Sequence, residues 1–168
     1  MKLKFLGFSL YWSKEGVRIR VHEKPLKRLA ERLKALTSRK RSGIMEGILR
    51  ELTVLLQGWL GYYSIADIKT YLKRISEWMR RWIRQIYWKR WKRVRTRSVN
   101  LTRLGVDLEQ AFQWANTRKG YWRTAGSGIL STTITNHYLE AKGFPNLVKR
   151  YEELRARAQR LTRLHATH

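Results

Sequence analysis

The sequence predicts a mainly α-helical protein in which an N-terminal β-hairpin is followed by a three-helix bundle and a smaller C-terminal helical module. Apolar residues recur at helical spacing from residue 25 onward, whereas strict alternation is confined to the segment before it. The length of 168 residues corresponds to about one domain, and 43% of the residues are hydrophobic, which suffices for a modest core.

The hairpin is predicted within residues 1–24. Two segments rich in β-branched and aromatic residues, 5–12 and 17–21, flank a turn at 13–16 that ends in glycine. The second segment alternates strictly, so its apolar side chains should share one face of the hairpin: Val17, Ile19 and Val21.

The bundle is predicted over residues 25–97. Pro25 suits the first position of a helix, because that position leaves its N–H unpaired in any case. The inner stripe of this helix consists of leucines at helical spacing: Leu26, Leu29, Leu33 and Leu36. A second helix is predicted from Ile44 to about Gly58, with this inner stripe: Ile48, Leu52, Leu55, Leu56 and Trp59.

The longest helix is predicted to follow residues 64–67, which match a capping box and make Asp67 a helix cap. Beyond Ile86, cations occupy the helical positions that are apolar in the preceding part of this helix. Either the helix breaks near Tyr87, or its end leaves the core and presents cations together with Trp88 and Trp91; the pattern favours the second. The apolar stripe before that point is Ile68, Tyr71, Leu72, Ile75, Trp78, Met79, Trp82 and Ile86.

The smaller module is predicted over residues 98–154, with the boundary to the bundle around 96–107. It should contain a helix that starts at an Asp107 cap, a loop at 117–123 and a helix over 128–142 closed by Gly143. Residues 155–168 are predicted to be a basic tail with a solvated, fraying helical face: Arg155, Arg157, Arg160 and Arg163.

The charge balance points to a polyanionic partner. The chain has 37 Lys and Arg against 12 Asp and Glu, a formal net charge of +25, and nucleic acid neutralises such a charge best. The best apolar run, 52–60, is too short to span a bilayer, so no membrane partner is expected. The absence of cysteine fits a reducing, cytoplasmic location.

Catalytic groups are not recognisable in the sequence. The only two aspartates, Asp67 and Asp107, are forty positions apart, whereas two-metal chemistry needs clustered carboxylates. The four histidines are scattered, and no Gly-rich phosphate loop occurs. No catalytic residue, metal site or cofactor is therefore predicted.

Binding residues are predicted where cations are dense or are interleaved with aromatic rings. Between residues 73 and 97 eleven cations face one acid, Glu77. Arginine suits phosphates, and rings in a basic strip suit unpaired bases, although such rings can equally pack the bundle. The predicted RNA-binding residues are Arg39, Lys40, Arg41, Lys73, Arg80, Arg81, Arg84, Trp88, Lys89, Arg90, Trp91, Lys92, Arg93, Arg95, Arg97, Arg118, Lys119, Tyr121, Trp122 and Arg123.

Several motifs resemble group II intron-encoded proteins. Phe5-Leu-Gly-Phe8 is similar to the closing hairpin of their reverse-transcriptase palm. Residues 118–123 and the Gly-Phe-Pro segment at 143–145 resemble the stretch that follows the thumb in bacterial members. Four further segments resemble the maturase-specific, or thumb, region of these proteins: Leu36-Thr-Ser-Arg39, Gln57-Gly-Trp-Leu-Gly-Tyr-Tyr63, residues 76–84 and Trp88-Lys-Arg-Trp-Lys92. The similarity covers about residues 3–152.

The resemblance implies a thumb-like bundle and an RNA-binding maturase domain that assists group II intron splicing by stabilising the folded intron RNA. The Tyr-x-Asp-Asp metal site and the Cys- and His-rich nuclease of full-length members are absent from this sequence. The chain is thus expected to be no enzyme by itself, but a fragment of an RNA-directed DNA polymerase and maturase.

Two alternatives remain open from the sequence. The chain could be the thumb subunit or a fragment of a split reverse transcriptase, gripping the primer–template duplex beside a separate chain that carries the polymerase palm and fingers. It could also be a basic DNA-binding module that uses the helix predicted over 127–143. A basic field alone does not distinguish RNA from DNA.

Overall fold

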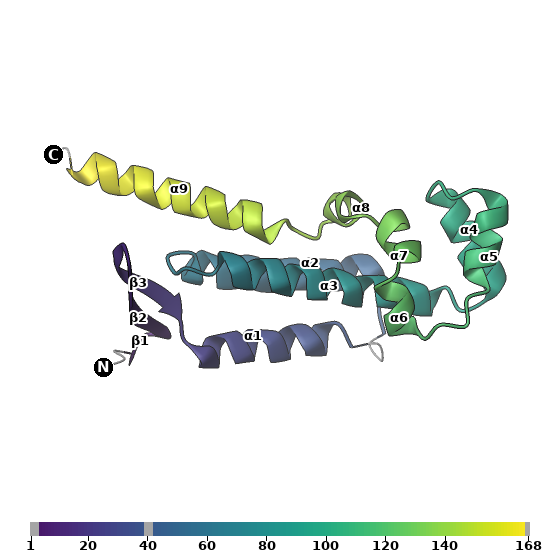
Figure 1. The fold of residues 1–168 in the computed structure, drawn as a ribbon, viewed down its shortest axis with the longest axis horizontal. Helices are drawn as coiled ribbons and strands as arrows, with labels where there is room; N and C mark the ends of the chain where they lie inside the picture. Colours follow the sequence, from purple (N-terminus) through teal and green to yellow (C-terminus); the bar gives the residue numbers. More distant parts are fainter. Residues whose placement is uncertain (1–3, 39–41, 167–168) are drawn as a thin grey trace.

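The computed structural model describes residues 4–38 and 42–166, and it is mainly helical, as predicted (Figure 1). Helices α2 (Met45–Tyr63) and α3 (Lys69–Arg90) run antiparallel and form the middle of the molecule. Helix α1 (Glu23–Leu36) covers one side of this pair, and α9 (Leu147–Ala166) lies along the other. Helix α1 packs mainly on α2, and α9 packs mainly on α3.

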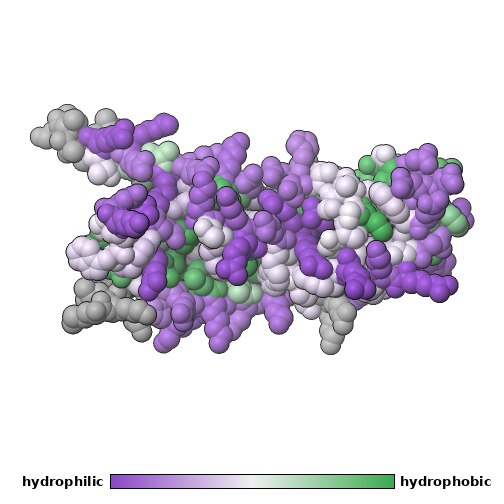
Figure 2. All heavy atoms as spheres, in the orientation of Figure 1, coloured by the Kyte–Doolittle hydropathy of each residue, from purple (hydrophilic) through white to green (hydrophobic). Residues whose placement is uncertain are grey.

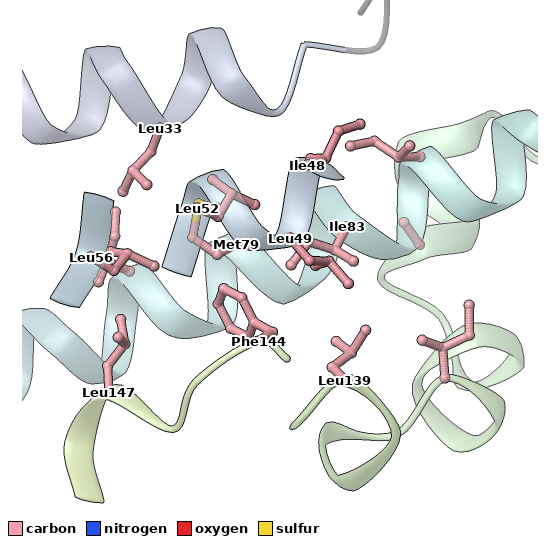
Figure 3. Close-up of a cluster of buried hydrophobic side chains, with 14 of the residues drawn as sticks. Leu33, Ile48, Leu49, Leu52, Leu56, Met79, Ile83, Leu139, Phe144 and Leu147 are labelled. Atoms are coloured by element: carbon pink, nitrogen blue, oxygen red, sulfur yellow. The ribbon is translucent and has the colours of Figure 1, made fainter. Parts of the chain in front are cut away.

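The core is formed where these layers meet, and its side chains come from segments far apart in the sequence (Figure 3). Leu33 of α1 meets the α2 stripe, Met79 and Ile83 of α3 lie behind it, and Phe144 closes the far side. Phe144 is fully buried in the connection between α8 and α9. The α2 residues in this core are Met45, Ile48, Leu49, Leu52, Leu56 and Leu60.

The hairpin is confirmed, with strands β2 (Phe8–Ser13) and β3 (Gly16–Val21) paired antiparallel. A two-residue strand, β1 (Lys4–Phe5), adds to β2 and was not predicted. Gly7 in the turn between them has φ +86°, and a Cβ there would lie 2.9 Å from the Tyr63 hydroxyl oxygen. Only glycine fits this close approach, which seats the turn against the end of α2.

Two helix boundaries differ from the prediction. Helix α1 begins at Glu23 because the Nδ1 atom of His22 accepts the N–H of Lys24, so Pro25 is its third residue, not its first. Helix α2 continues past Gly58 to Tyr63. Burial of Leu60 and partial burial of Trp59 offset the low helix propensity of its glycines.

The capping box predicted at residues 64–67 is wrong. Ser64 ends α2, and α3 begins at Lys69 without a side-chain cap. Asp67 instead holds three elements together: its carboxylate accepts from Arg155 Nη1 of α9 at 2.8 Å, and it lies 3.4 Å from Arg18 Nε of β3 and 3.2 Å from the Tyr11 hydroxyl of β2. Arg155 is thus not part of a solvated face.

Electrostatics favour the ionised form of Asp67. Partial burial opposes ionisation, but the hydrogen bonds from Arg155 and Tyr11 and the charge of Arg18 outweigh it and lower the pKa of this carboxyl. The same pairing raises the pKa of Arg155.

A series of short helices follows α3. Helix α4 (Val94–Arg103) was not predicted and packs against α5 (Leu108–Ala115), which Asp107 caps as expected. Helix α6 (Tyr121–Ala125) packs on α3.

The single helix predicted over 128–142 is wrong, because α7 (Gly128–Thr133) and α8 (Asn136–Ala141) are separate. The break follows from four successive β-branched residues at 132–135, and the Thr135 hydroxyl caps α8 by accepting the N–H of Tyr138. Gly143, at φ +97°, closes α8 as predicted. The DNA-binding alternative relied on one continuous helix over 127–143. Because that helix is divided into α7 and α8, this alternative has lost its structural basis.

No helix within the described ranges combines the length and apolar character needed to cross a bilayer.

Replacing Asp67 with asparagine should destabilise the fold by about 1–2 kcal/mol at neutral pH, because Arg155 and Arg18 lose their shared carboxylate. Urea unfolding followed by circular dichroism measures this change. Glu152→Gln, which breaks the exposed Lys69–Glu152 pair, is the control and should cost less than about 0.5 kcal/mol.

The loss of stability caused by Asp67→Asn should become smaller as the pH is lowered. Because the folded-state pKa of Asp67 lies below its ordinary value of 3.8, its contribution is complete well above that pH and is lost as the pH falls through the lowered pKa. The difference between wild type and variant should therefore shrink in acid. A difference that grew in acid would contradict this assignment.

Candidate nucleic-acid interface

Most of the predicted binding residues gather at one end of the molecule, where α3 ends and α4, α5 and α6 follow (Figure 1). The chain has no acidic residue between Glu77 and Asp107, and this stretch carries ten cations. Hydrophilic side chains cover most of the face seen in Figure 2. The cations at this end fall into two groups, which differ in what they contact.

The first group consists of four arginines that bind the protein's own backbone. Arg81 donates through Nε and Nη2 to the carbonyl of Trp122, at 3.2 and 3.0 Å. Arg84 Nε donates to the carbonyl of Ile134 at 2.9 Å. Arg90 Nη2 bonds the carbonyl of Gly43 at 2.6 Å, and Arg97 Nε bonds that of Trp91 at 2.9 Å. The carbonyls of Gly43, Trp91 and Ile134 lie in a loop or at helix ends, which leave acceptors unpaired, whereas the Trp122 carbonyl also accepts the N–H of Gly126.

Burial distinguishes Arg84 within this group. Desolvation, reinforced by the charge of Arg80, lowers the pKa of the Arg84 guanidinium. Arg84 Nη2 also donates to Asn136 Oδ1 at 3.1 Å, so Arg84 fixes the junction between α7 and α8 to α3. Arg80 is half-buried, and its Nε has no hydrogen-bond partner among the described residues.

The second group of predicted cations is exposed and has no ion pair or side-chain hydrogen bond within the described part of the chain: Lys73, Lys92, Arg93, Arg95, Arg118, Lys119 and Arg123. Lys73 lies in the first half of α3, away from the others. Lys89 is half-buried and makes contacts of its own. Arg39, Lys40 and Arg41 lie outside the described residues.

The two tryptophans predicted to stand among the cations are not presented together. Trp88 is 1% exposed and belongs to the core, with the Arg97 guanidinium 4.5 Å from its ring centroid. Trp91 is partly buried against Trp88 and Tyr87. Helix α3 continues past Tyr87, as the sequence pattern favoured. The Trp88 indole was expected to be exposed, but Arg97 of α4 lies over its ring.

The aromatic residues of α6 are accessible. Tyr121 is 38% exposed and Trp122 37%. The Trp122 ring packs against Trp82 at 5.2 Å between centroids, and the Arg81 guanidinium lies 4.1 Å from its centroid. The ring of Trp122 is thus held in place while part of it faces solvent.

An open groove of about 570 Å³ lies where α6 meets α3, and the sequence did not reveal it. It is lined by Arg74, Glu77, Trp78, Arg81 and Trp122, together with Tyr71 and Ile75. Trp78 was predicted as core, and Arg74 and Glu77 only as members of a charged stretch. Glu77 and Trp78 follow Arg74 by three and four residues, and this spacing could have indicated that the three side chains share a helix face.

No group of three or more histidine, aspartate or glutamate side chains that could hold a metal ion occurs in residues 4–38 and 42–166. What this end of the molecule offers a ligand is guanidinium and ammonium donors beside accessible ring faces.

Sequence comparison finds a known domain family within this chain. Residues 26–105 match the family model of the group II intron maturase-specific domain. The match covers most of α1 and all of α2, α3 and α4, and it supports a likeness of this segment to the C-terminal region of group II intron maturases. A search of curated proteins finds no match to the chain.

Replacing Gly126 with alanine should loosen α6 from α3. A Cβ at this position would lie 2.6 Å from Arg81 Cζ, so the guanidinium must move away from the Trp122 carbonyl and ring. We expect a loss of about 1 kcal/mol in stability and faster amide hydrogen exchange in α6.

Gly128→Ala is the matched control, because a Cβ there meets nothing within 4 Å and alanine favours the helix. It should leave α6 unchanged. Equal effects of the two substitutions would show that Arg81 does not hold α6.

Proposed function

We propose that this chain is an RNA-binding maturase domain that assists group II intron splicing by stabilising the folded intron RNA, without catalysis of its own. The family match supports a role in intron splicing. The observation that carries the binding mechanism is the division of the cations at one end of the molecule: half-buried arginines bond backbone carbonyls and hold the helices, and exposed cations stand free beside them.

The mechanism is electrostatic. Exposed lysines and arginines displace the counterions that surround phosphates, and a rigid scaffold fixes the positions at which they do so. The contacts of Arg81, Arg84 and Arg97 provide this rigidity, since they fasten α6, the junction between α7 and α8 and the end of α3. A folded RNA that fits these fixed positions is favoured over unfolded alternatives.

Binding to intron RNA should weaken steeply with salt. If six to ten phosphates are neutralised, the logarithm of the association constant should fall against the logarithm of the salt concentration with a slope of about −5 to −9 on duplex-like sites. Filter binding across a salt series measures the slope. A flat dependence would remove the electrostatic mechanism.

The joint replacement of Lys92, Arg93 and Arg95 with alanine should weaken binding and reduce the steepness of the slope by about three, without loss of helical circular dichroism. The control is the joint replacement of Lys27, Arg32 and Lys34, which removes the same charge from the exposed face of α1. Equal losses in the two variants would contradict an interface at the α3–α4 end.

A second candidate function is that of a thumb subunit beside a separate polymerase chain. The observation that favours it is a bare apolar patch at the tip of the hairpin: Leu10 is 41% exposed, Trp12 84% and Val17 52%. Phe8, by contrast, packs on Tyr62 and Tyr63, so that end of the sheet is already covered.

The thumb alternative predicts that the chain co-sediments with a separately expressed palm-and-fingers chain of a group II intron reverse transcriptase. Trp12→Asp should abolish the complex, because it places a charge in the apolar contact. Absence of a complex with the wild-type chain would eliminate this candidate.

A further inference from the structure

The groove between α3 and α6 joins indole side chains and a guanidinium to a carboxylate in the middle of a basic surface. Glu77 is the only acid in α3 and is exposed along this groove. Arg74 and Arg81 lie three and four residues away on the same helix, yet Glu77 forms no ion pair with either. Within the described residues its carboxylate is therefore free to accept hydrogen bonds from a ligand.

The walls of the groove are suited to a planar ligand. Trp78 and Trp122 contribute indoles, and the Arg81 guanidinium lies against the Trp122 ring. Two hydrogen bonds to the Trp122 carbonyl fix this guanidinium, so the flat platform exists before any ligand arrives. The Arg81 Nη1 group forms no hydrogen bond within the described residues and can donate to a ligand. Unpaired bases stack on aromatic rings and on guanidinium planes in this way.

The charges of the groove select among planar ligands. Beside its carboxylate, Glu77 disfavours a phosphate or an acidic side chain and favours a nucleobase that donates hydrogen bonds. A carboxylate has two acceptor oxygens, and guanine presents two adjacent donors, N1–H and the N2 amine, on its Watson–Crick edge. Arg74, at the same groove, can contact the phosphate of that nucleotide.

We propose that the groove between α3 and α6 binds an unpaired guanosine of the RNA, with the base stacked against Trp78, Trp122 and Arg81 and its Watson–Crick edge bonded to the Glu77 carboxylate. The inference rests on the proposed RNA-binding function and adds base selectivity to it. The exposed cations of α4 then contact phosphates, and this groove reads one base.

The test uses the full chain and labelled single-stranded RNAs of about nine nucleotides, a length typical of such sites. The RNAs are oligouridines whose central base is guanine, hypoxanthine or uracil. Hypoxanthine keeps N1–H but lacks the N2 amine, so it removes one of the two donors. Fluorescence anisotropy at fixed salt should give about fivefold tighter binding for guanine than for hypoxanthine.

Variants assign the selectivity to residues. Glu77→Ala should bring the guanine-to-hypoxanthine ratio to about one, because the carboxylate that accepts from the N2 amine of guanine is lost. Glu31→Ala, which removes an equally exposed charge from α1, should keep the ratio of the wild type. Arg74→Ala should weaken all three RNAs alike and leave the ratio unchanged.

Each remaining outcome contradicts a defined part of the account. Salt-dependent binding with no preference for guanine in the wild type, or a preference that persists in Glu77→Ala, overturns the groove assignment and leaves the proposed RNA-binding function intact. No binding of the wild type to these RNAs or to intron RNA overturns both.

Discussion

The shortage of carboxylates shapes this structure more than any other constraint. With 37 cations and 12 acids, most arginines cannot find an acidic partner. Buried guanidinium groups still require acceptors, because a charge removed from water without hydrogen bonds is costly. Here the acceptors are backbone carbonyls at helix ends and the faces of indoles, as the contacts of Arg81 and Arg97 illustrate. The carboxylate of Asp67 is used where three elements meet.

This arrangement explains how one helix can serve both the stability of the fold and the proposed binding of RNA. Helix α3 turns its apolar stripe toward α2, and on its other side Arg81 and Arg84 secure the short helices α6 to α8. Those helices are too short to be stable alone and depend on such contacts. Because these arginines neutralise no acid in making those contacts, the surface keeps a strongly positive field, as the proposed binding of RNA requires.

Local periodicity was enough to predict the hairpin and the three helices of the bundle, since each has a continuous apolar face, such as Leu29 and Leu33 in α1. The role of Asp67 could not be predicted, because its partner Arg155 is 88 positions away. Helix α4 carries few apolar residues and a high charge, so no periodic signal marked it. Trp88 fell on a basic line of the helical wheel, and only the return of Arg97 over its ring shows it to be core. The groove escaped notice because α6, which forms one wall, is remote in sequence.

The central claim is that the arginines of this domain divide into those that hold the fold and those that bind RNA. Arginine Nε–H signals in nuclear magnetic resonance spectra report on both properties, through their exchange with water and their shifts on titration with a short structured RNA. The account predicts slow exchange and little shift for Arg81, Arg84 and Arg97, and fast exchange with large RNA-induced shifts for Arg93, Arg95 and Arg123. Uniform exchange across all six, or shifts that begin at Arg84 and Arg97, would contradict it.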